Sequence, residues 1–275
     1  FFLSGGEDSR IIVTSLLTGD VLIKVDHHRG PVNSIRIDST GEFLVTGSSD
    51  CTVCLWCLDG FSLLRSTVLP SPVTMIDISA DSVFLLAACE DQKLYLRCLA
   101  TGTEIHTLRG HQGEVKSICL ISRDRAMAVT GGVDSLVNLW QLNTHELLYT
   151  FEGHIASVTC IAFSPSDSRS LITGSRDMSL KVWQLAGGKL SQVLVGHTDH
   201  VTCVAVAVLD KSIVVSGSRD ANLIIWDINT GSDLHTLKGH LGYITCIKLS
   251  GDGSLAASGS EDKSLIIWDM KKGCS

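Results

Sequence analysis

Residues 197–239 have the sequence HTDHVTCVAVAVLDKSIVVSGSRDANLIIWDINTGSDLHTLKG, and this stretch decides the fold. Four short runs in it are rich in β-branched and apolar residues, and they cover 201–208, 213–217, 223–228 and 233–237. Gly, Asn, Asp and Ser residues stand between the runs. Apolar runs separated by such turn formers are typical of β-strands joined by short connections. The stretch therefore predicts four strands and no helix.

The same pattern recurs along the chain. Gly-His pairs begin 43 residues apart each time, at Gly110, Gly153, Gly196 and Gly239. An Asp precedes every Trp of the chain by six residues, in the pairs Asp50/Trp56, Asp134/Trp140, Asp177/Trp183, Asp220/Trp226 and Asp262/Trp268. In the same register, Arg97 follows Asp91 and Thr14 follows Asp8, so another residue replaces the Trp in two units. A period of this length indicates a repeat architecture, and the register predicts seven units.

These markers resemble the WD40 family, whose repeats carry Gly-His and Trp-Asp signatures and form the four-stranded blades of a β-propeller. The literal Trp-Asp pair stands at Trp226-Asp227 and Trp268-Asp269. The resemblance implies an all-β, seven-bladed WD40 β-propeller that occupies residues 1–275 as a single domain. The first unit starts at its second strand and the last ends at its third, so we expect incomplete first and last blades and 26 strands.

The incomplete end units indicate either a seven-bladed ring that closes imperfectly or a fragment of a longer chain, and they favour the fragment. The mixture of regular and degenerate repeats is also similar to the WD arrays that follow a NACHT module in signalling ATPases, whose propellers sense ligands. No residue of this sequence belongs to such a module.

The family resemblance implies a buried hydrogen-bond chain of Asp, His, Ser or Thr, and Trp in each regular unit. The matching sets are His28/Thr46/Asp50/Trp56, His111/Thr130/Asp134/Trp140, His154/Thr173/Asp177/Trp183, His197/Ser216/Asp220/Trp226 and His240/Ser258/Asp262/Trp268. Buried carboxylates and imidazoles are costly without partners, and these side chains can satisfy one another. The units around Asp8 and Asp91 lack the set, and we expect them to be the softest.

A Ser-His-Asp set also invites a hydrolase interpretation. Five copies at near-fixed spacing, each tied to a Trp, favour a structural role instead, because a catalytic triad is a single constellation. The sequence holds no HExxH and no phosphate-binding glycine loop such as GxxxxGKS. We therefore predict no enzyme activity, with a propeller enzyme as the alternative.

Cysteines at one repeat position, Cys160, Cys203 and Cys246, are expected to be small core residues. The run from Cys51 to Cys57 suggests metal spacing, but Cys54 and Cys57 point to opposite faces of a strand and no second ligand pair follows. We expect no metal and no cofactor. Repeated reduced cysteines suit a cytoplasmic protein.

The charge balance bears on the class of partner. The chain has 22 Lys and Arg against 29 Asp and Glu, a net charge of −7. Nucleic-acid binding needs clustered basic residues, so this balance disfavours it, although a local basic sector could overrule that. The longest apolar runs have seven residues, whereas a membrane helix needs about 20, so we expect no membrane partner.

Propellers of this family commonly bind partners where the loops before the first strand and between the second and third strands gather. We call this the upper face. Three repeat positions there vary from unit to unit, as a recognition surface requires. The residues predicted to bind a partner are Arg176, Arg219, His200, Tyr243, Glu114, Lys116, Glu90 and Glu261. The basic and aromatic members favour an acidic peptide or protein, because Arg and Tyr are enriched at binding hot spots; the alternative is a solvated rim.

The sequence as a whole predicts a non-catalytic, cytoplasmic scaffold for protein–protein interaction, or a ligand-sensing propeller in signalling. Its upper face would hold the partner.

Overall fold

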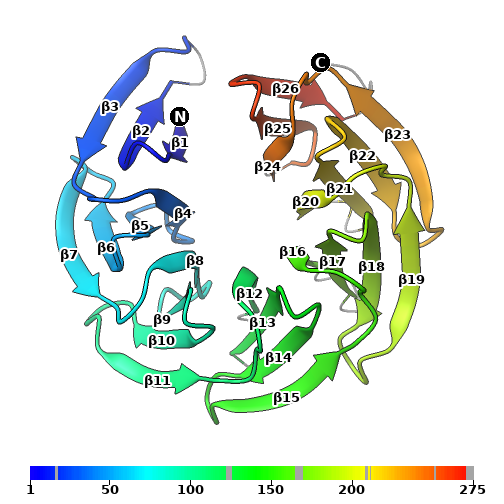
Figure 1. Ribbon diagram of the computed structural model, residues 1–275. Helices are drawn as coiled ribbons and strands as arrows, with labels where there is room; N and C mark the ends of the chain where they lie inside the picture. Colours follow the sequence, from blue (N-terminus) through cyan, green and yellow to red (C-terminus); the bar gives the residue numbers. More distant parts are fainter. Residues whose placement is uncertain are drawn as a thin grey trace. The chain divides into compact units, whose positions relative to one another are not determined.

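The computed structural model describes residues 1–15, 18–121, 126–164, 170–207, 210, 212–250 and 252–270. Every helix or strand in this part of the chain is a β-strand, and 26 strands form seven antiparallel sheets (Figure 1). The chain divides into two compact units, residues 1–129 with 139–148 and residues 130–138 with 149–275. We describe each unit by itself.

The first unit contains three complete sheets. The first sheet has the order β1 (Phe2–Gly5), β2 (Arg10–Thr14), β3 (Val21–Asp26). The second has the order β4 (Val32–Ile37), β5 (Phe43–Ser48), β6 (Thr52–Cys57), β7 (Ser62–Val68). The third has the order β8 (Val73–Ile78), β9 (Phe84–Cys89), β10 (Leu94–Cys98), β11 (Glu104–Leu108).

The fourth sheet is divided between the two units. Its strands follow chain order as β12 (Val115–Ile121), β13 (Met127–Gly132), β14 (Val137–Gln141) and β15 (Glu146–Phe151).

The second unit contains the remaining three sheets. The fifth sheet is β16 (Val158–Ser164), β17 (Ser170–Ser175), β18 (Ser179–Gln184), β19 (Leu190–Val195). The sixth is β20 (Val201–Val206), β21 (Ile213–Ser218), β22 (Asn222–Asp227), β23 (Ser232–Lys238). The seventh is β24 (Ile244–Leu249), β25 (Leu255–Ser260), β26 (Leu265–Asp269).

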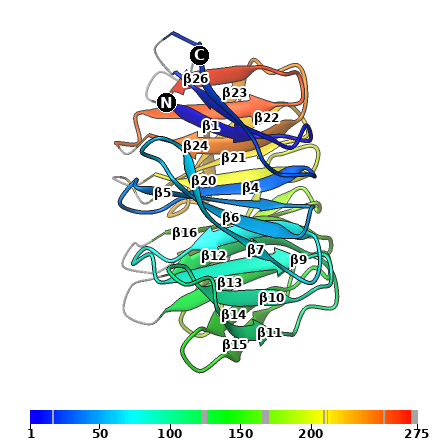
Figure 2. The same cartoon turned by 90° about the vertical axis from the view of Figure 1, so that its left-hand side faces the viewer.

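Within each unit, neighbouring sheets pack face to face and their first strands lie side by side. Strand β8 contacts both β4 and β12 in the first unit, and β20 contacts both β16 and β24 in the second. Figure 2 shows the β4–β7 and β8–β11 sheets following one another in the first unit. The space between sheets is filled by aliphatic side chains; Ile76 and Leu86, for example, are fully buried. The middle strands are therefore apolar on both faces, as in a sheet covered on both sides.

The structure confirms the predicted strand pattern. The four runs of residues 197–239 form β20 to β23, and Trp226 of β22 pairs with Val214 of β21. The first and seventh sheets have three strands in the described residues and the other five have four, which is the predicted 26. The first run ends earlier than expected, at Val206, and its predicted end at Val208 lies outside the described residues.

Candidate functional site

The recurring polar side chains form the predicted buried chain. In the sixth sheet, the Nδ1–H of His197 donates to Asp220 over 2.8 Å, and the hydroxyl of Ser216 donates to its Nε2 over 2.8 Å. The indole N–H of Trp226 donates to the same hydroxyl over 2.7 Å. The sets around Trp56, Trp183 and Trp268 repeat these bonds, and His111, Thr130 and Trp140 of the remaining set are buried.

The Gly of the Gly-His pair leaves room for the Trp ring. A Cβ atom on Gly196 would lie 2.9 Å from Cη2 of Trp226. In the second sheet, His27 replaces this Gly, and its ring meets Trp56 edge to face at 5.4 Å. The indole therefore packs against the chain just before the His in both versions of the unit.

The Asp of each set is kept in its charged form by the hydrogen-bond donors around it. Burial raises the pKa of Asp220, but hydrogen bonds from His197 and from the backbone N–H groups of Thr198 and Asn222 outweigh burial and lower it to about 2. The pKa of Asp50 is lowered to about 2 in the same way: burial opposes the shift, and bonds from Thr52, Arg29 and His28 produce it. These carboxylates are charged at neutral pH because donors surround them.

The repeated sets hold the blades together from the inside. The side chains of His28, His154, His197 and His240 have no exposed surface. A general base must come within hydrogen-bond reach of the proton that it removes from a substrate, and these imidazoles are already bonded on both nitrogens. The structural interpretation of the Ser-His-Asp sets therefore fits their geometry.

The third sheet replaces the missing set with another pair, which the sequence did not reveal. The hydroxyl of Tyr95 donates to Asp91 over 2.8 Å, and Lys93 donates to the same oxygen over 2.8 Å. A Tyr two residues before the replaced Trp position was the available signal. In the first sheet, Asp8 accepts only the backbone N–H of Arg10 among the bonds of the described residues.

Two of the variable positions predicted to bind a partner, the one before the first strand and the one after the second strand, are joined by a backbone hydrogen bond. The backbone N–H of Arg219 donates to the carbonyl of His200 over 2.9 Å, and that of Glu261 donates to Tyr243 over 2.9 Å. Equivalent bonds join Arg176 to Ser157 and, in the first unit, Glu90 to Pro72. The loop before the first strand and the loop after the second are thus tied together in each blade.

The second unit carries the basic and aromatic members on its upper face. The guanidinium of Arg219 lies over the ring of Tyr243, 5.2 Å from its centre, and so joins the sixth blade to the seventh. Both side chains are exposed, as is Arg176. Within the part of the chain that the structure describes, neither guanidinium pairs with a carboxylate, and no hydrogen bond joins Arg176 to Arg219, His200 or Tyr243. We call Arg176, Arg219, His200 and Tyr243 the basic sector.

The remaining four residues predicted to bind a partner are acidic or are paired with an acidic residue. Glu114 and Lys116 form an ion pair of 2.6 Å with each other in the first unit. Glu90 and Glu261 are exposed at the ends of the second strands of their blades.

The variable position after the first strand's opening residue has a structural role that the sequence did not show. The hydroxyl of Thr202 donates to the carbonyl of Ile244 in the next blade over 2.5 Å. Thr159 and Thr74 make the equivalent bonds to Val201 and Val115, and the amide of Asn33 donates to Val73. These side chains link neighbouring blades, so their variability between Thr and Asn does not mark a recognition surface.

Two exposed aliphatic side chains were missed in the sequence. Ile155 and Leu241 directly follow the buried His of their blades, and they are 89% and 95% exposed. Their backbone N–H groups donate to Asp177 and Asp262, which fixes their position. The signal was a large aliphatic residue directly after a Gly-His pair.

The cysteine prediction is partly wrong. Cys160 is buried, as predicted, but Cys203 is half-buried and Cys246 is exposed. The first strand of the seventh blade leaves its sulfur uncovered, although that sulfur packs over Gly259. Among the described residues, no group of three or more His, Cys, Asp and Glu side chains has the arrangement needed to hold a metal ion. The same residues contain no helix with the length and apolar character of a membrane span.

Comparison with known proteins finds relatives built from the same repeat. The chain is 35% identical over 117 residues to cilia- and flagella-associated protein 52 of Chlamydomonas reinhardtii, covering 41% of this chain and 18% of that protein. It is 24% identical over 142 residues to pre-mRNA-processing factor 19 of Mus musculus, covering 51% and 28%. It is 26% identical over 128 residues to eukaryotic translation initiation factor 3 subunit I of Neurospora crassa, covering 46% and 37%. The chain spans well under half the length of these relatives.

The family model described as "WD domain, G-beta repeat" matches residues 19–57, 102–141, 145–184, 188–227 and 231–269, which is more than half of the chain. The unmatched stretch between 57 and 102 holds the first three strands of the third sheet, where Tyr95 and Arg97 replace the usual set. Together with the seven sheets and their Trp-centred polar sets, this match shows that the chain belongs to the WD40-repeat family and that its fold is a seven-bladed β-propeller.

Proposed function

We propose that this propeller is a non-catalytic scaffold that captures an acidic segment of a partner protein on the upper face of its second unit. The observation that carries the proposal is the Arg219–Tyr243 pair, which places an unpaired guanidinium over an exposed aromatic ring. An Arg held over an aromatic face keeps its N–H groups free for a carboxylate, and Arg and Tyr dominate binding hot spots.

The charge of the basic sector supports an acidic partner. The chain carries a net charge of −7, yet Arg176 and Arg219 occupy the same repeat position on neighbouring blades. Complementary charge raises the rate of encounter and fixes the register of a bound segment.

The exposed aliphatic side chains of the same loops support a partner that is also apolar. Ile155 lies in the loop bonded to the Arg176 loop, and Leu241 precedes Tyr243 in the seventh blade. Isolated exposed apolar residues are ordinary on protein surfaces. Here both have their backbones fixed beside the basic sector, so binding would bury apolar area at little cost in ordering.

The relatives support the scaffold role in general terms. One is named as a subunit of a translation initiation factor, and another, from Dictyostelium discoideum, as a protein of the U5 small nuclear ribonucleoprotein. We infer that this chain also works within an assembly and has no enzyme activity of its own. A cytoplasmic location, a role in signalling and the similarity to NACHT-linked arrays stay predictions.

The test is charge reversal at both arginines. The probe is a synthetic peptide with the repeated sequence Glu-Leu-Asp, compared with its Lys-Leu-Lys counterpart, and affinity is measured by fluorescence anisotropy at 50 and 200 mM salt. We expect the wild-type protein to bind only the acidic peptide, more weakly at high salt. Replacing Arg176→Glu and Arg219→Glu together should abolish binding.

A matched control distinguishes the loss of the binding site from the effect of a change in the protein's net charge. The double variant Lys189→Glu and Lys248→Glu makes the same change in charge on exposed residues of the second unit, in the turn before β19 and in the later half of β24, and it should keep most of the affinity. Equal binding by the arginine variant and the wild type, or equal loss in both double variants, would refute the basic sector as the binding site.

A further inference from the structure

The outer strands of the blades reach sideways to the next blade. In the first unit, Nη1 of Arg65 on β7 donates to the carbonyl of Ala100, in the turn between β10 and β11. In the second unit, Nε2 of Gln192 on β19 donates to the carbonyl of Asn229 in the corresponding turn over 3.1 Å. The outer strand of one blade and the turn of the next thus form a repeated lateral contact.

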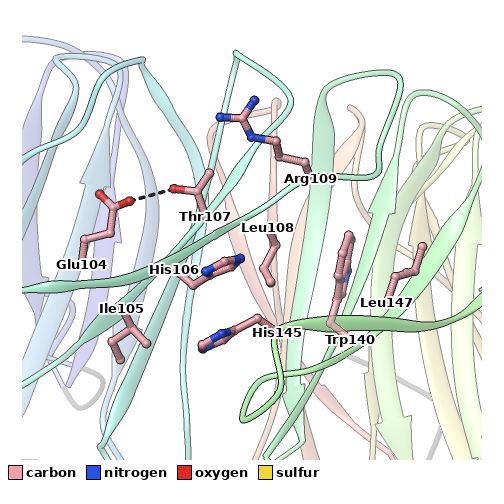
Figure 3. A pocket seen from close by; sticks show the side chains of 9 residues that line it. All are labelled: Glu104, Ile105, His106, Thr107, Leu108, Arg109, Trp140, His145 and Leu147. Carbon is pink, nitrogen blue, oxygen red and sulfur yellow. Dashed lines mark hydrogen bonds between the residues drawn. The ribbon is translucent and has the colours of Figure 1, made fainter.

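The third blade makes this contact with an imidazole pair. His106 lies on β11, at the position opposite Leu96 that corresponds to Arg65 opposite Leu55. Its ring stacks on the ring of His145, with 4.3 Å between centres and 5° between planes. Figure 3 shows the two rings lying face to face.

His145 stands at a backbone position that favours glycine. Its φ is 63°, and the equivalent turn residues are Gly19, Gly102, Gly188 and Gly231, with φ between 65° and 76°, and Phe61, with φ 48°. L-residues adopt this left-handed conformation rarely, and strained residues of this kind cluster at functional sites. The turn at His145 places a second imidazole beside His106, where four of the other blades have a glycine.

The pair lines a pocket of about 630 Å³. Arg109, Glu104, Ile105 and Leu147 also line it, and Arg109 directly follows β11, the strand that carries His106 (Figure 3). Trp140, buried at its floor, belongs to the polar set of the next blade.

The ionisable groups of the pocket are one guanidinium, two imidazoles and one carboxylate. Its one carboxylate, Glu104, accepts from the hydroxyl of Thr107 over 2.8 Å and from Arg97 over 3.4 Å, so it is already occupied. Within the described residues, Arg109 has no acidic partner. Arg109 lines the same pocket as the two imidazoles, with its guanidinium directed away from their rings (Figure 3), in a chain with a net charge of −7.

We propose that this pocket binds the phosphate of a phosphorylated side chain in a peptide segment of a partner. Guanidinium groups bind phosphate oxygens in a bidentate manner, and a phosphate dianion favours protonation of neighbouring imidazoles. Ile105 and Leu147 are 38% and 43% exposed, so they can contact the residues that flank the phosphate. The site shares no residue with the basic sector and does not depend on it.

Binding is measured by calorimetry and by the NMR signals of the His106 and His145 imidazoles. The probes are a Leu-phosphoserine-Leu peptide, its unphosphorylated form, inorganic phosphate, and vesicles of phosphatidylcholine with a phosphorylated inositol lipid. We expect the phosphopeptide to bind at least tenfold tighter than inorganic phosphate or the unphosphorylated peptide and to shift both imidazole signals.

The variant His145→Gly is the decisive change. It restores the residue that the turn favours, so folding should be kept, and it should weaken phosphopeptide binding at least tenfold. Arg109→Gln should do the same, whereas His235→Gln, at the same repeat position of the sixth blade, should leave binding unchanged. Unchanged affinity in His145→Gly, or binding of the vesicles without binding of the phosphopeptide, would overturn the proposal.

Discussion

A carboxylate remains charged inside each regular blade because three donors surround it. Asp220 accepts from the imidazole of His197 and from the backbone N–H groups of Thr198 and Asn222. One side chain thereby fixes the loop before the first strand and the turn between the second and third strands. The same residue that completes the buried chain also shapes the upper face.

This role predicts how stability depends on pH. The pKa of Asp220 in the folded protein is about 2, and that of an unfolded Asp is about 4. Stabilisation by the charged carboxylate is therefore complete above about pH 4 and is lost as the pH falls toward 2. We expect the melting temperature to fall steeply in this interval, as followed by circular dichroism, and the fall to be shallower in Asp220→Asn.

Asp233→Asn is the control for the pH experiment. It removes a carboxylate from the exposed outer strand β23 without touching the buried chain. The prediction fails if Asp220→Asn keeps the wild-type slope between pH 4 and 2, or if Asp233→Asn flattens the slope equally.

At the scale of strands, neighbouring blades are linked at two places. The first strands are joined by Thr and Asn side chains that donate to a carbonyl of the next blade, as Thr202 does to Ile244. The fourth strands are joined to the next turn by longer side chains such as Arg65 and Gln192. Apolar packing between sheets is nondirectional, so these bonds set the register between the blades.

The inner link can be measured with Thr202→Val. Valine keeps the shape and β-branching of threonine but cannot donate to Ile244, so we expect a loss of about 1 kcal/mol in the free energy of unfolding. The measurement is the shift of the urea midpoint.

Thr245→Val is its matched control. Thr245 occupies the same repeat position in the seventh blade, but among the described residues its hydroxyl donates only to Gly259 of its own blade. This variant should cost less than Thr202→Val; equal losses would show that the bond between the blades adds nothing.

The sequence predicted the strands from local patterns that recur in fixed register, and the resemblance to the WD40 family implied the buried sets. It could not predict the inner link, because the acceptor of Thr202 is a backbone carbonyl 42 residues away. A variable Thr at a loop boundary looks like a surface residue until the neighbouring strand is in place. The Tyr95–Asp91 bond and the His106–His145 stack could not be predicted for another reason. In each of them an unrelated residue replaces the one that the repeat usually carries.

Across the whole molecule, the blades differ in how their interiors are held. The fifth, sixth and seventh blades each contain the complete polar chain, whereas the third relies on Tyr95 and Asp91 and the first has Thr14 at the Trp position. The sequence alone predicted that the first and third blades would be the softest. Because Asp91 accepts from Tyr95 and Lys93, we expect the stability of the third blade to lie between that of the first and that of the regular blades.

Native-state hydrogen exchange can rank them. We compare the third strands, β2, β10 and β22, because each pairs on both sides in its own sheet. A side chain that bridges strands raises the free energy of local opening, and each tenfold in exchange rate corresponds to about 1.4 kcal/mol. We expect amides of β2 to exchange at least tenfold faster than those of β22, with β10 between them. Slower exchange in β2 than in β22 would show that packing between sheets, and not the polar chain, sets the stability of a blade. If the bond from Tyr95 to Asp91 stabilises the third blade, Tyr95→Phe should raise the exchange rate of β10 toward that of β2.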